Sequence, residues 1–260
     1  MRMPDGTAGS HAVRIYRDEQ ELVGPVASHL AEGFAAGEPA IVVASARHRR
    51  LFAEELERLG WNPAALDETG LLTAVDAEGT LAGLLENAGP SRHRFHALIG
   101  GLLTRAGTAY PGRTVRVYGE MVDLLARRGR HEAALALEEL WDELARRRRF
   151  SLLCAYGLDV FDPAAQKGIV AAVCRAHDHV VPAADAARLE DAVGHALADT
   201  LGPDEAERIR RLAREARRDA HIPAAQLALM WVSARMPALA GRILGAARTA
   251  YDSPALAPGR

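Results

Sequence analysis

The sequence has few cysteines and almost no lysine. Its 260 residues include two cysteines, Cys154 and Cys174, and a single lysine, Lys167. Two cysteines cannot build a disulfide framework, and both lie in apolar segments, so we expect reduced thiols. Because the formal net charge is only −2, the composition favours neither a protein that coats nucleic acid nor one that binds a membrane surface.

Long apolar runs are also missing. The first ten residues, MRMPDGTAGS, contain no apolar core of a signal peptide, and no run approaches the roughly 18–20 apolar residues that a membrane span needs. We therefore expect no membrane association and a cytoplasmic location. Residues 1–10 are small and polar and are predicted to be disordered, and residues 253–260 are predicted to form a tail.

Between residues 11 and 182, short apolar strands alternate with amphipathic helices. Strands are predicted over residues 11–16, 40–45, 71–75, 114–118 and 150–156. Helices are predicted over residues 21–36, 47–59, 80–87, 92–107, 132–147 and 164–177. This alternation is typical of a parallel sheet covered by helices on both faces. The predicted fold class is α/β, a three-layer domain with a mainly parallel five-stranded sheet.

After Pro182 only helical periodicity remains, with breaks at Gly202-Pro203, Pro223 and Pro237. We predict an all-helical appendage of three or four helices over residues 183–252. One stretch of it, residues 224–244, has a weak similarity to a helix-turn-helix. The near-balanced charge of the appendage does not favour DNA binding, which normally leaves a basic surface. A DNA-binding regulator that uses these helices stays an alternative.

The predicted sheet also indicates where a ligand would bind. In an open parallel sheet, ligands bind beyond the carboxyl ends of the strands. A P-loop ATPase would carry GxxxxGK[ST] after the first strand, whereas residues 17–24 read RDEQELVG. Three acidic side chains and no lysine would repel a triphosphate, so we do not expect ATP hydrolysis through a P-loop.

A set of short motifs occurs here in an order and at spacings that resemble a known family, the MEDS sensory domain. The family is named for methanogens, methylotrophs and the DcmR repressor. The strongest part is residues 115–156, with Gly119-Glu120-Met121, Leu137-Glu138, Trp141 and Cys154-Ala-Tyr156. The remaining matches are His11, Tyr16, Gly33, Gly37-Glu38, Gly70, Asp76, Arg94-Phe95, Phe161, Cys174 and His177. The similarity covers roughly residues 11–182.

The resemblance implies a RecA- or KaiC-like fold without a Walker A loop, and a role in sensing small molecules. Relatives carry this domain beside helix-turn-helix, histidine-kinase and other signalling modules. This chain has no recognisable kinase and no DNA-binding domain at its N-terminus, so its output is not implied by the resemblance.

Six residues are predicted to bind the ligand: His11, Tyr16, Arg116, Glu120, Tyr156 and His177. Glu120 follows a strand at a position where a RecA-like ATPase keeps acidic residues, and its carboxylate could accept hydrogen bonds. The tyrosines end strands and combine an apolar ring with a hydroxyl group. Neutral histidines can donate and accept hydrogen bonds. The alternative for each residue is a structural hydrogen bond, an ion pair or core packing.

Cys174-x-x-His177 has the spacing of metal ligands, but a zinc site usually needs four ligands, and Cys154 is isolated on a strand. We predict no metal and no cofactor. The chain is predicted to be a non-catalytic sensory protein with a small organic ligand, a protein signalling partner and, as an alternative, a homodimer. A nucleotide binder with a degenerate RecA-like site is a further alternative.

Overall fold

The computed structural model describes residues 9–86, 89–181, 185–215 and 222–253. Most of the segment predicted to be disordered, residues 1–10, and most of the predicted tail lie outside the described residues. The prediction is wrong for Gly9 and Ser10, which form backbone hydrogen bonds with Phe150 and Leu152. The chain forms two compact units. The first contains the residues up to Gly157 together with Ala176–Val181, and the second contains Leu158–Arg175 and the chain after Val181. The predicted domain bounds, with a division after residue 182, remain a prediction.

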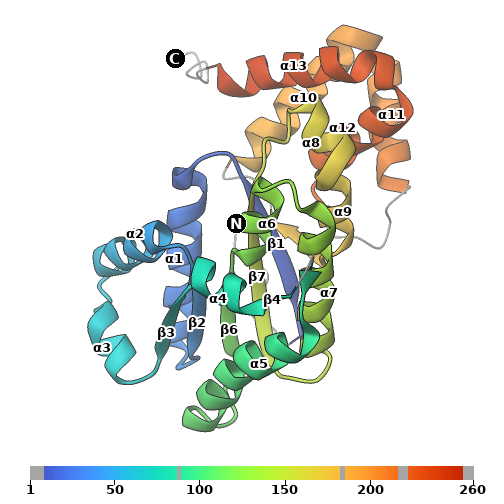
Figure 1. Cartoon of the computed structure of the whole chain (residues 1–260). Helices are drawn as coiled ribbons and strands as arrows, with labels where there is room; N and C mark the ends of the chain where they lie inside the picture. Colours follow the sequence, from blue (N-terminus) through green and yellow to red (C-terminus); the bar gives the residue numbers. More distant parts are fainter. Residues whose placement is uncertain (1–8, 87–88, 182–184, 216–221, 254–260) are drawn as a thin grey trace. The chain divides into compact units, whose positions relative to one another are not determined.

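The first unit is built on a six-stranded parallel sheet, in the order β3-β2-β6-β7-β1-β8 (Figure 1). Its strands are β1 His11–Tyr16, β2 Ala40–Ala44, β3 Leu72–Asp76, β6 Val115–Gly119, β7 Phe150–Gly157 and β8 His179–Val181. The predicted α/β class with a mainly parallel sheet is confirmed. The sixth strand, β8, was not predicted, because three residues are too few for a strand pattern.

The helices of the first unit are α1 Glu19–Ala35, α2 Ala46–Arg58, α3 Pro63–Glu68, α4 Ala77–Leu84, α5 Arg92–Ala109, α6 Met121–Arg127 and α7 His131–Ala145. A two-stranded hairpin, β4 Leu85–Glu86 and β5 Gly89–Pro90, precedes α5. The short helices α3 and α6 were not predicted. At six and seven residues they contain fewer than two turns each, so no periodicity identifies them.

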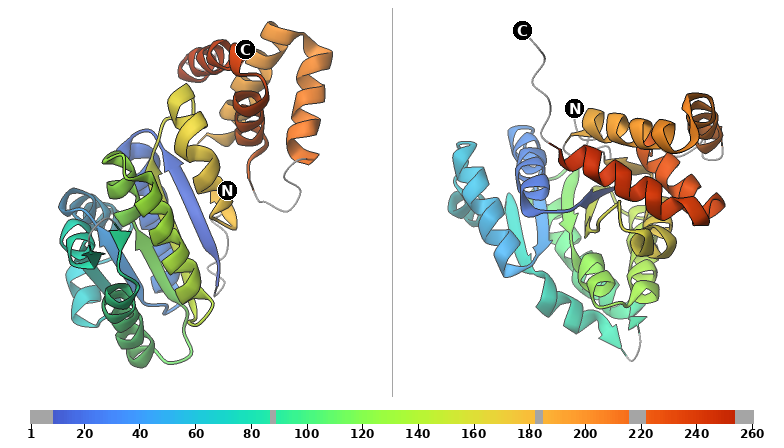
Figure 2. Two further views of the ribbon diagram at one scale, coloured as in Figure 1. Left: turned by 45° about the vertical axis from the view of Figure 1, so that its right-hand side comes forward. Right: turned by 90° about the horizontal axis from the view of Figure 1, so that it is seen from above.

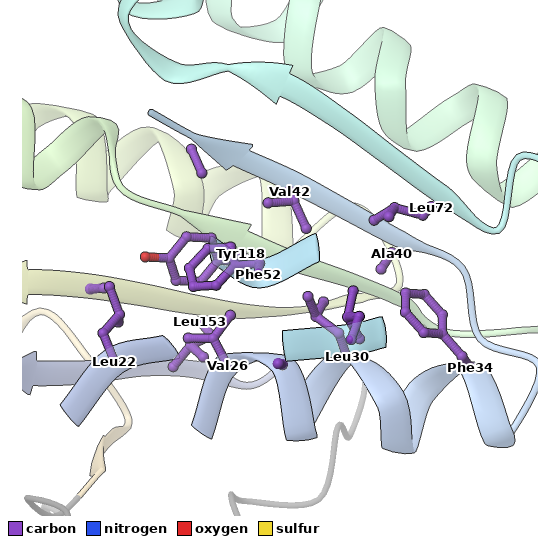
Figure 3. Close-up of a cluster of buried hydrophobic side chains, with 14 of the residues drawn as sticks. Leu22, Val26, Leu30, Phe34, Ala40, Val42, Phe52, Leu72, Tyr118 and Leu153 are labelled. Atoms are coloured by element: carbon purple, nitrogen blue, oxygen red, sulfur yellow. The ribbon is translucent and has the colours of Figure 1, made fainter. Parts of the chain in front are cut away.

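Helices α1 and α2 cover one face of the sheet. Leu22, Val26, Leu30 and Phe34 lie at spacings of four along α1 and are buried against the strands (Figure 3). The carboxylate of Asp18 caps the helix by accepting the N–H of Glu21. The predicted amphipathic helix is therefore present, and its apolar stripe forms part of this core.

Helices α5 and α7 cover the opposite face (Figure 2). The Trp141 ring of α7 lies 5.0 Å from the ring of Phe95 in α5 and 6.1 Å from that of Phe150 in β7. Both faces of the sheet are thus covered by helices, and alternate residues of each strand direct their side chains toward opposite faces.

The second unit consists of helices: α8 Pro163–Ala165, the π-helical turn η1 Gln166–Val170, α9 Ala171–Arg175, α10 Ala186–Leu201, α11 Pro203–Glu215, α12 Ala224–Arg235 and α13 Pro237–Asp252. The predicted helical region after residue 182 is confirmed. The helix predicted over residues 164–177 ends at Arg175 and contains the π-helical turn. Its segment packs with the second unit, where the rings of Phe161 and Tyr251 lie 5.6 Å apart. Within the described part of the chain, no helix combines the length and the apolar character that crossing a membrane requires.

Candidate functional site

The six residues predicted to bind a ligand occupy three separate places. Tyr16 and Glu120 lie at the carboxyl edge of the sheet, whereas Arg116 is the second residue of β6 and lies below α1. In the register of β1 and β7, Tyr156 is paired with Ile15 and not with Tyr16, so the two tyrosines face opposite sides of the sheet. The six residues predicted to bind the ligand therefore do not share one cleft.

The first place is set by the topology of the sheet. Strands β2 and β6 are neighbours, but the chain leaves β2 toward β3 and leaves β6 toward β7, in opposite directions. Adjacent strands whose connections diverge in this way form the crevice in which open α/β sheets bind ligands. The residues that follow the two strands are Ser45 and Glu120.

Glu120 is a fully paired carboxylate at this position, with only 2 % of its surface exposed. One oxygen accepts the backbone N–H of Ser45, and the other accepts Nδ1–H of His48 and, at 3.1 Å, the hydroxyl of Tyr118. Burial alone would raise the pKa of Glu120, but His48 and the Ser45 N–H hold it below its ordinary value. Glu120 is therefore ionised, and it orients the imidazole of His48.

A second buried carboxylate lies beside the first. Asp123 accepts the backbone N–H of Gly157 at 2.9 Å, the Nε–H of Arg127 at 2.7 Å and the Tyr16 hydroxyl at 3.3 Å. Burial raises the pKa of Asp123 despite the neighbouring guanidinium. Burial and the charge of Asp123 also raise the pKa of Tyr16. We name Tyr16, His48, Glu120, Asp123 and Arg127 the edge network.

The acidic loop after β1 forms the outer side of the edge network. Glu19 forms an ion pair with Arg47, and its carboxylate lies 3.8 Å from Nε2 of His48. Glu21 accepts the backbone N–H of Arg17 at 2.9 Å. The acidic side chains that replace a P-loop therefore cap α1 and face the histidine.

An apolar hollow of about 220 Å³ lies on the α1 side of the sheet. It is lined by Leu30, Val42, Arg49, Phe52, Ala53, Leu56, Pro63, Asp67, Leu72 and Ala74. The ring of Phe52, which lines the hollow, lies 5.8 Å from that of His48 and 5.1 Å from that of Tyr118, so the hollow adjoins the edge network. This volume is smaller than that of pockets for drug-sized ligands.

The second place is a buried cluster on the α7 side, which brings together His11 and His177 of the predicted set. Glu138 lies between them, with Glu138 Oε2 at 3.3 Å from His11 Nε2 and Glu138 Oε1 at 3.4 Å from His177 Nε2. The thiol of Cys154 lies 3.4 Å from His11 Nε2 and 3.5 Å from Glu138 Oε2. All four residues are buried.

Neighbouring side chains form hydrogen bonds with residues of this cluster. His11 Nδ1 lies 2.7 Å from Asp142, and the hydroxyl of Tyr156 donates to Glu138 at 2.7 Å. Burial would raise the pKa of Glu138, but His177 and His11 lower it well below its ordinary value. Burial and the Glu138 charge raise the pKa of Cys154 to about 12.

Sequence reasoning identified the histidines and Tyr156 of this cluster but gave Glu138 and Cys154 no site role. One signal was available: Glu138 follows Leu137 and precedes Trp141 by three, so a carboxylate stands on the apolar face of α7. Cys174, which the sequence paired with His177, belongs to α9 in the second unit and not to the cluster.

Arg116 forms the third place. Its guanidinium donates to Glu38 at 2.7 Å and to the backbone carbonyl of His29 at 2.8 Å, and it lies 3.2 Å from Nδ1 of that histidine. Burial and the guanidinium lower the pKa of His29 to about 4. Arg116 thus forms an ion pair with Glu38, as in the structural alternative given above for the predicted ligand-binding residues.

Residues 10–178 match the model of one protein family, described as the MEthanogen/methylotroph, DcmR Sensory domain. The match covers more than half of the chain and includes both the edge network and the buried cluster. No curated protein matches the chain.

Proposed function

The chain belongs to the MEDS family of sensory domains, and from this premise we propose that it is a non-catalytic sensor that binds a small organic molecule at the edge network. The observation that carries the proposal is the place of Glu120. A buried, ionised carboxylate at the switch point of the sheet is costly for folding, and perturbed groups of this kind are concentrated at functional sites.

The ligand that suits this edge has a polar group and a small apolar part. Glu120 fixes the imidazole of His48 by its Nδ1, which leaves Nε2 to exchange a hydrogen bond. Phe52 and the apolar hollow beside it offer contact to a few carbon atoms. The half-exposed Arg127 adds a donor for an anionic or carbonyl oxygen.

A route for the signal follows from the chain. Asp123 holds the N–H of Gly157, and the chain enters the second unit at the next residue, Leu158. A ligand that forms hydrogen bonds with Tyr16 or Arg127 would compete with their hydrogen bonds to Asp123. The hydrogen bond between Asp123 and the N–H of Gly157 would change as a result. The proposal is that occupancy alters the helices of the second unit, which then contact a signalling partner or a second copy.

The test is a thermal-shift and calorimetry panel on the full chain, with small alcohols, aldehydes, carboxylates, halogenated hydrocarbons and nucleotides. A ligand at about 100 times its Kd should stabilise the fold by about 2.7 kcal/mol. The variant Glu120→Gln should lose this response. The control is Asp76→Asn, which changes a more exposed carboxylate in the last residue of β3 and keeps a good helix cap.

Equal responses in the wild type and in Glu120→Gln would contradict binding at the edge network. A response to nucleotides alone that is abolished by Glu120→Gln would favour the alternative, a nucleotide binder with a degenerate RecA-like site, over a sensor of another organic molecule. A mobility shift of DNA fragments that weakens steeply with salt would favour the DNA-binding alternative instead.

A further inference from the structure

The buried cluster has a geometry that hydrogen bonding does not explain well. Its inward distances, from His11 Nε2 to Glu138 and to Cys154 and from His177 Nε2 to Glu138, are 3.3 to 3.4 Å. Its outward hydrogen bonds, to Asp142 and from Tyr156, are both 2.7 Å. Charge-assisted N–H···O hydrogen bonds normally measure about 2.7–2.9 Å, so the two contacts between histidine nitrogens and Glu138 oxygens are longer than the outward hydrogen bonds.

The inward distances match the edges of a metal coordination tetrahedron. With Zn–N about 2.0–2.1 Å, Zn–O about 2.0–2.2 Å and Zn–S about 2.3 Å, ligand atoms at tetrahedral angles lie about 3.3–3.6 Å apart. Three contacts, those among His11 Nε2, Glu138 Oε2 and the Cys154 sulfur, measure 3.3 to 3.5 Å and fall in this range, and His177 Nε2 lies 3.4 Å from the other oxygen of Glu138. The four ligand atoms all lie within 4.8 Å of one another.

The surroundings also fit a metal. Asp142 lies 2.7 Å from Nδ1 of His11, the arrangement in which second-shell carboxylates accept Nδ1–H and direct Nε2 of a metal-bound histidine toward the metal. The Tyr156 hydroxyl occupies one oxygen of Glu138 and leaves the other to face His11 and Cys154. A thiolate, a carboxylate and two neutral imidazoles carry two negative charges, which a divalent cation neutralises in a buried site.

We propose that His11, Glu138, Cys154 and His177 form a closed tetrahedral site for a divalent transition-metal ion, with Zn²⁺ as the expected occupant. The mixed set of one sulfur, two nitrogens and one oxygen suits Zn²⁺ and excludes the oxygen-seeking Mg²⁺ and Ca²⁺. The metal would join β1, α7, β7 and the segment before β8. This inference does not depend on the proposed ligand at the edge network.

The experiment is metal analysis of the full chain, purified without a chelator or an affinity tag that binds metals, followed by removal of the metal and titration with Zn²⁺ and Co²⁺. We expect about one metal ion per chain. The Co²⁺ form should show the intense visible bands of tetrahedral coordination and a thiolate charge-transfer band in the near ultraviolet.

Cys154→Ser should remove the charge-transfer band and weaken Zn²⁺ binding at least about 10-fold, and Asp142→Asn should weaken it about 10–100-fold. Cys174→Ser is the matched control, a second buried cysteine outside the cluster, and should keep the band. Glu120→Gln should also keep it, so that failure of the ligand proposal is distinguished from failure of this one.

Circular dichroism establishes that each variant is folded. If Cys154→Ser does not fold, Asp142→Asn provides the test of Zn²⁺ binding instead. Folded wild-type protein that binds neither Zn²⁺ nor Co²⁺ at micromolar concentration would overturn the site. Unchanged metal content and an unchanged charge-transfer band in Cys154→Ser would overturn it as well.

Discussion

Individual buried charges in the first unit are held by partners from distant parts of the chain. Glu120 is paired with a histidine 72 positions earlier, and Arg116 with a carboxylate 78 positions earlier. Removing one partner of such a pair leaves an uncompensated buried charge and typically costs about 3–5 kcal/mol. Apolar residues in these places would often give an equally stable fold, which is consistent with a functional reason for the charges at the sheet edge.

His29 predicts a specific dependence of stability on pH. Its pKa falls from 6.5 to about 4 in the folded protein, because burial and Arg116 disfavour the imidazolium, while Glu38 neutralises that guanidinium from the other side. Between these values the unfolded chain binds the proton and the folded chain does not. The folded state therefore loses up to about 3 kcal/mol as the pH falls from 6.5 to 4.

The measurement is denaturant unfolding of the wild type and of His29→Gln at several pH values. Glutamine can still accept from Arg116 but does not titrate, so the difference between the two proteins should shrink as the pH falls through this window. A difference that stays constant from pH 7 to pH 4 would mean that His29 does not titrate as inferred.

Helix α1 approaches the sheet closely at one glycine. A Cβ atom on Gly33 would lie 2.5 Å from Cδ of Arg116 and 2.7 Å from its Nε. The guanidinium cannot move aside without leaving Glu38 and His29, to which it is hydrogen-bonded. The absence of a side chain at Gly33 is thus what allows the ion pair under α1 to form.

Gly33→Ala should therefore lower the free energy of unfolding, by about 1–3 kcal/mol. Gly24→Ala is its control in the same helix, since a Cβ there would meet nothing within 4 Å, and it should raise stability by about 0.5–1 kcal/mol. Chemical denaturation of both variants checks this opposition. Equal effects of the same sign would show that Arg116 accommodates the added methyl group.

The elements that the sequence predicts best are those with long patterns. The four-residue spacing of apolar side chains in α1 and the continuous apolar run of β2 each identify one element, because burial of a single face or of both faces leaves a distinct pattern. In contrast, β8 is fixed by pairing with β1 through three residues, and that pairing is a property of the tertiary structure.

The two units have separate apolar cores, and we expect them to respond separately to a core mutation. Ile243→Ala removes a fully buried side chain from the second core and should cost about 2–5 kcal/mol there. Hydrogen exchange measured by mass spectrometry should show faster exchange in α10–α13, with β1 and β2 little changed. Arg242→Ala, at the exposed neighbouring position, should change neither region.

Equal loss of protection in both units of Ile243→Ala would contradict this expectation and indicate a single cooperative unit. Reduced protection in the first unit alone would contradict it more strongly. Either result would also bear on the proposed route of the signal, because units that unfold together are tightly coupled.

The candidate sites were only partly predictable from the sequence, for a geometric reason. Topology places the ends of β2 and β6 together, and the strand pattern is enough to predict that Glu120 lies at this edge of the sheet. The sequence does not show strand register, however, and register decides that Tyr16 and Tyr156 face opposite sides of the sheet. The partners His48 and Glu138 lie on helices, whose orientation about their axes depends on packing.

The place of β1 in the sheet has a consequence for biosynthesis. Its hydrogen-bonded neighbours are β7 and β8, which follow it by more than 130 residues. This strand therefore leaves the ribosome before either partner and stays unpaired until more than 130 further residues have been made. During that interval its apolar residues and unpaired backbone are open to chaperones and to other nascent chains, and closure of the sheet must be a late, slow event.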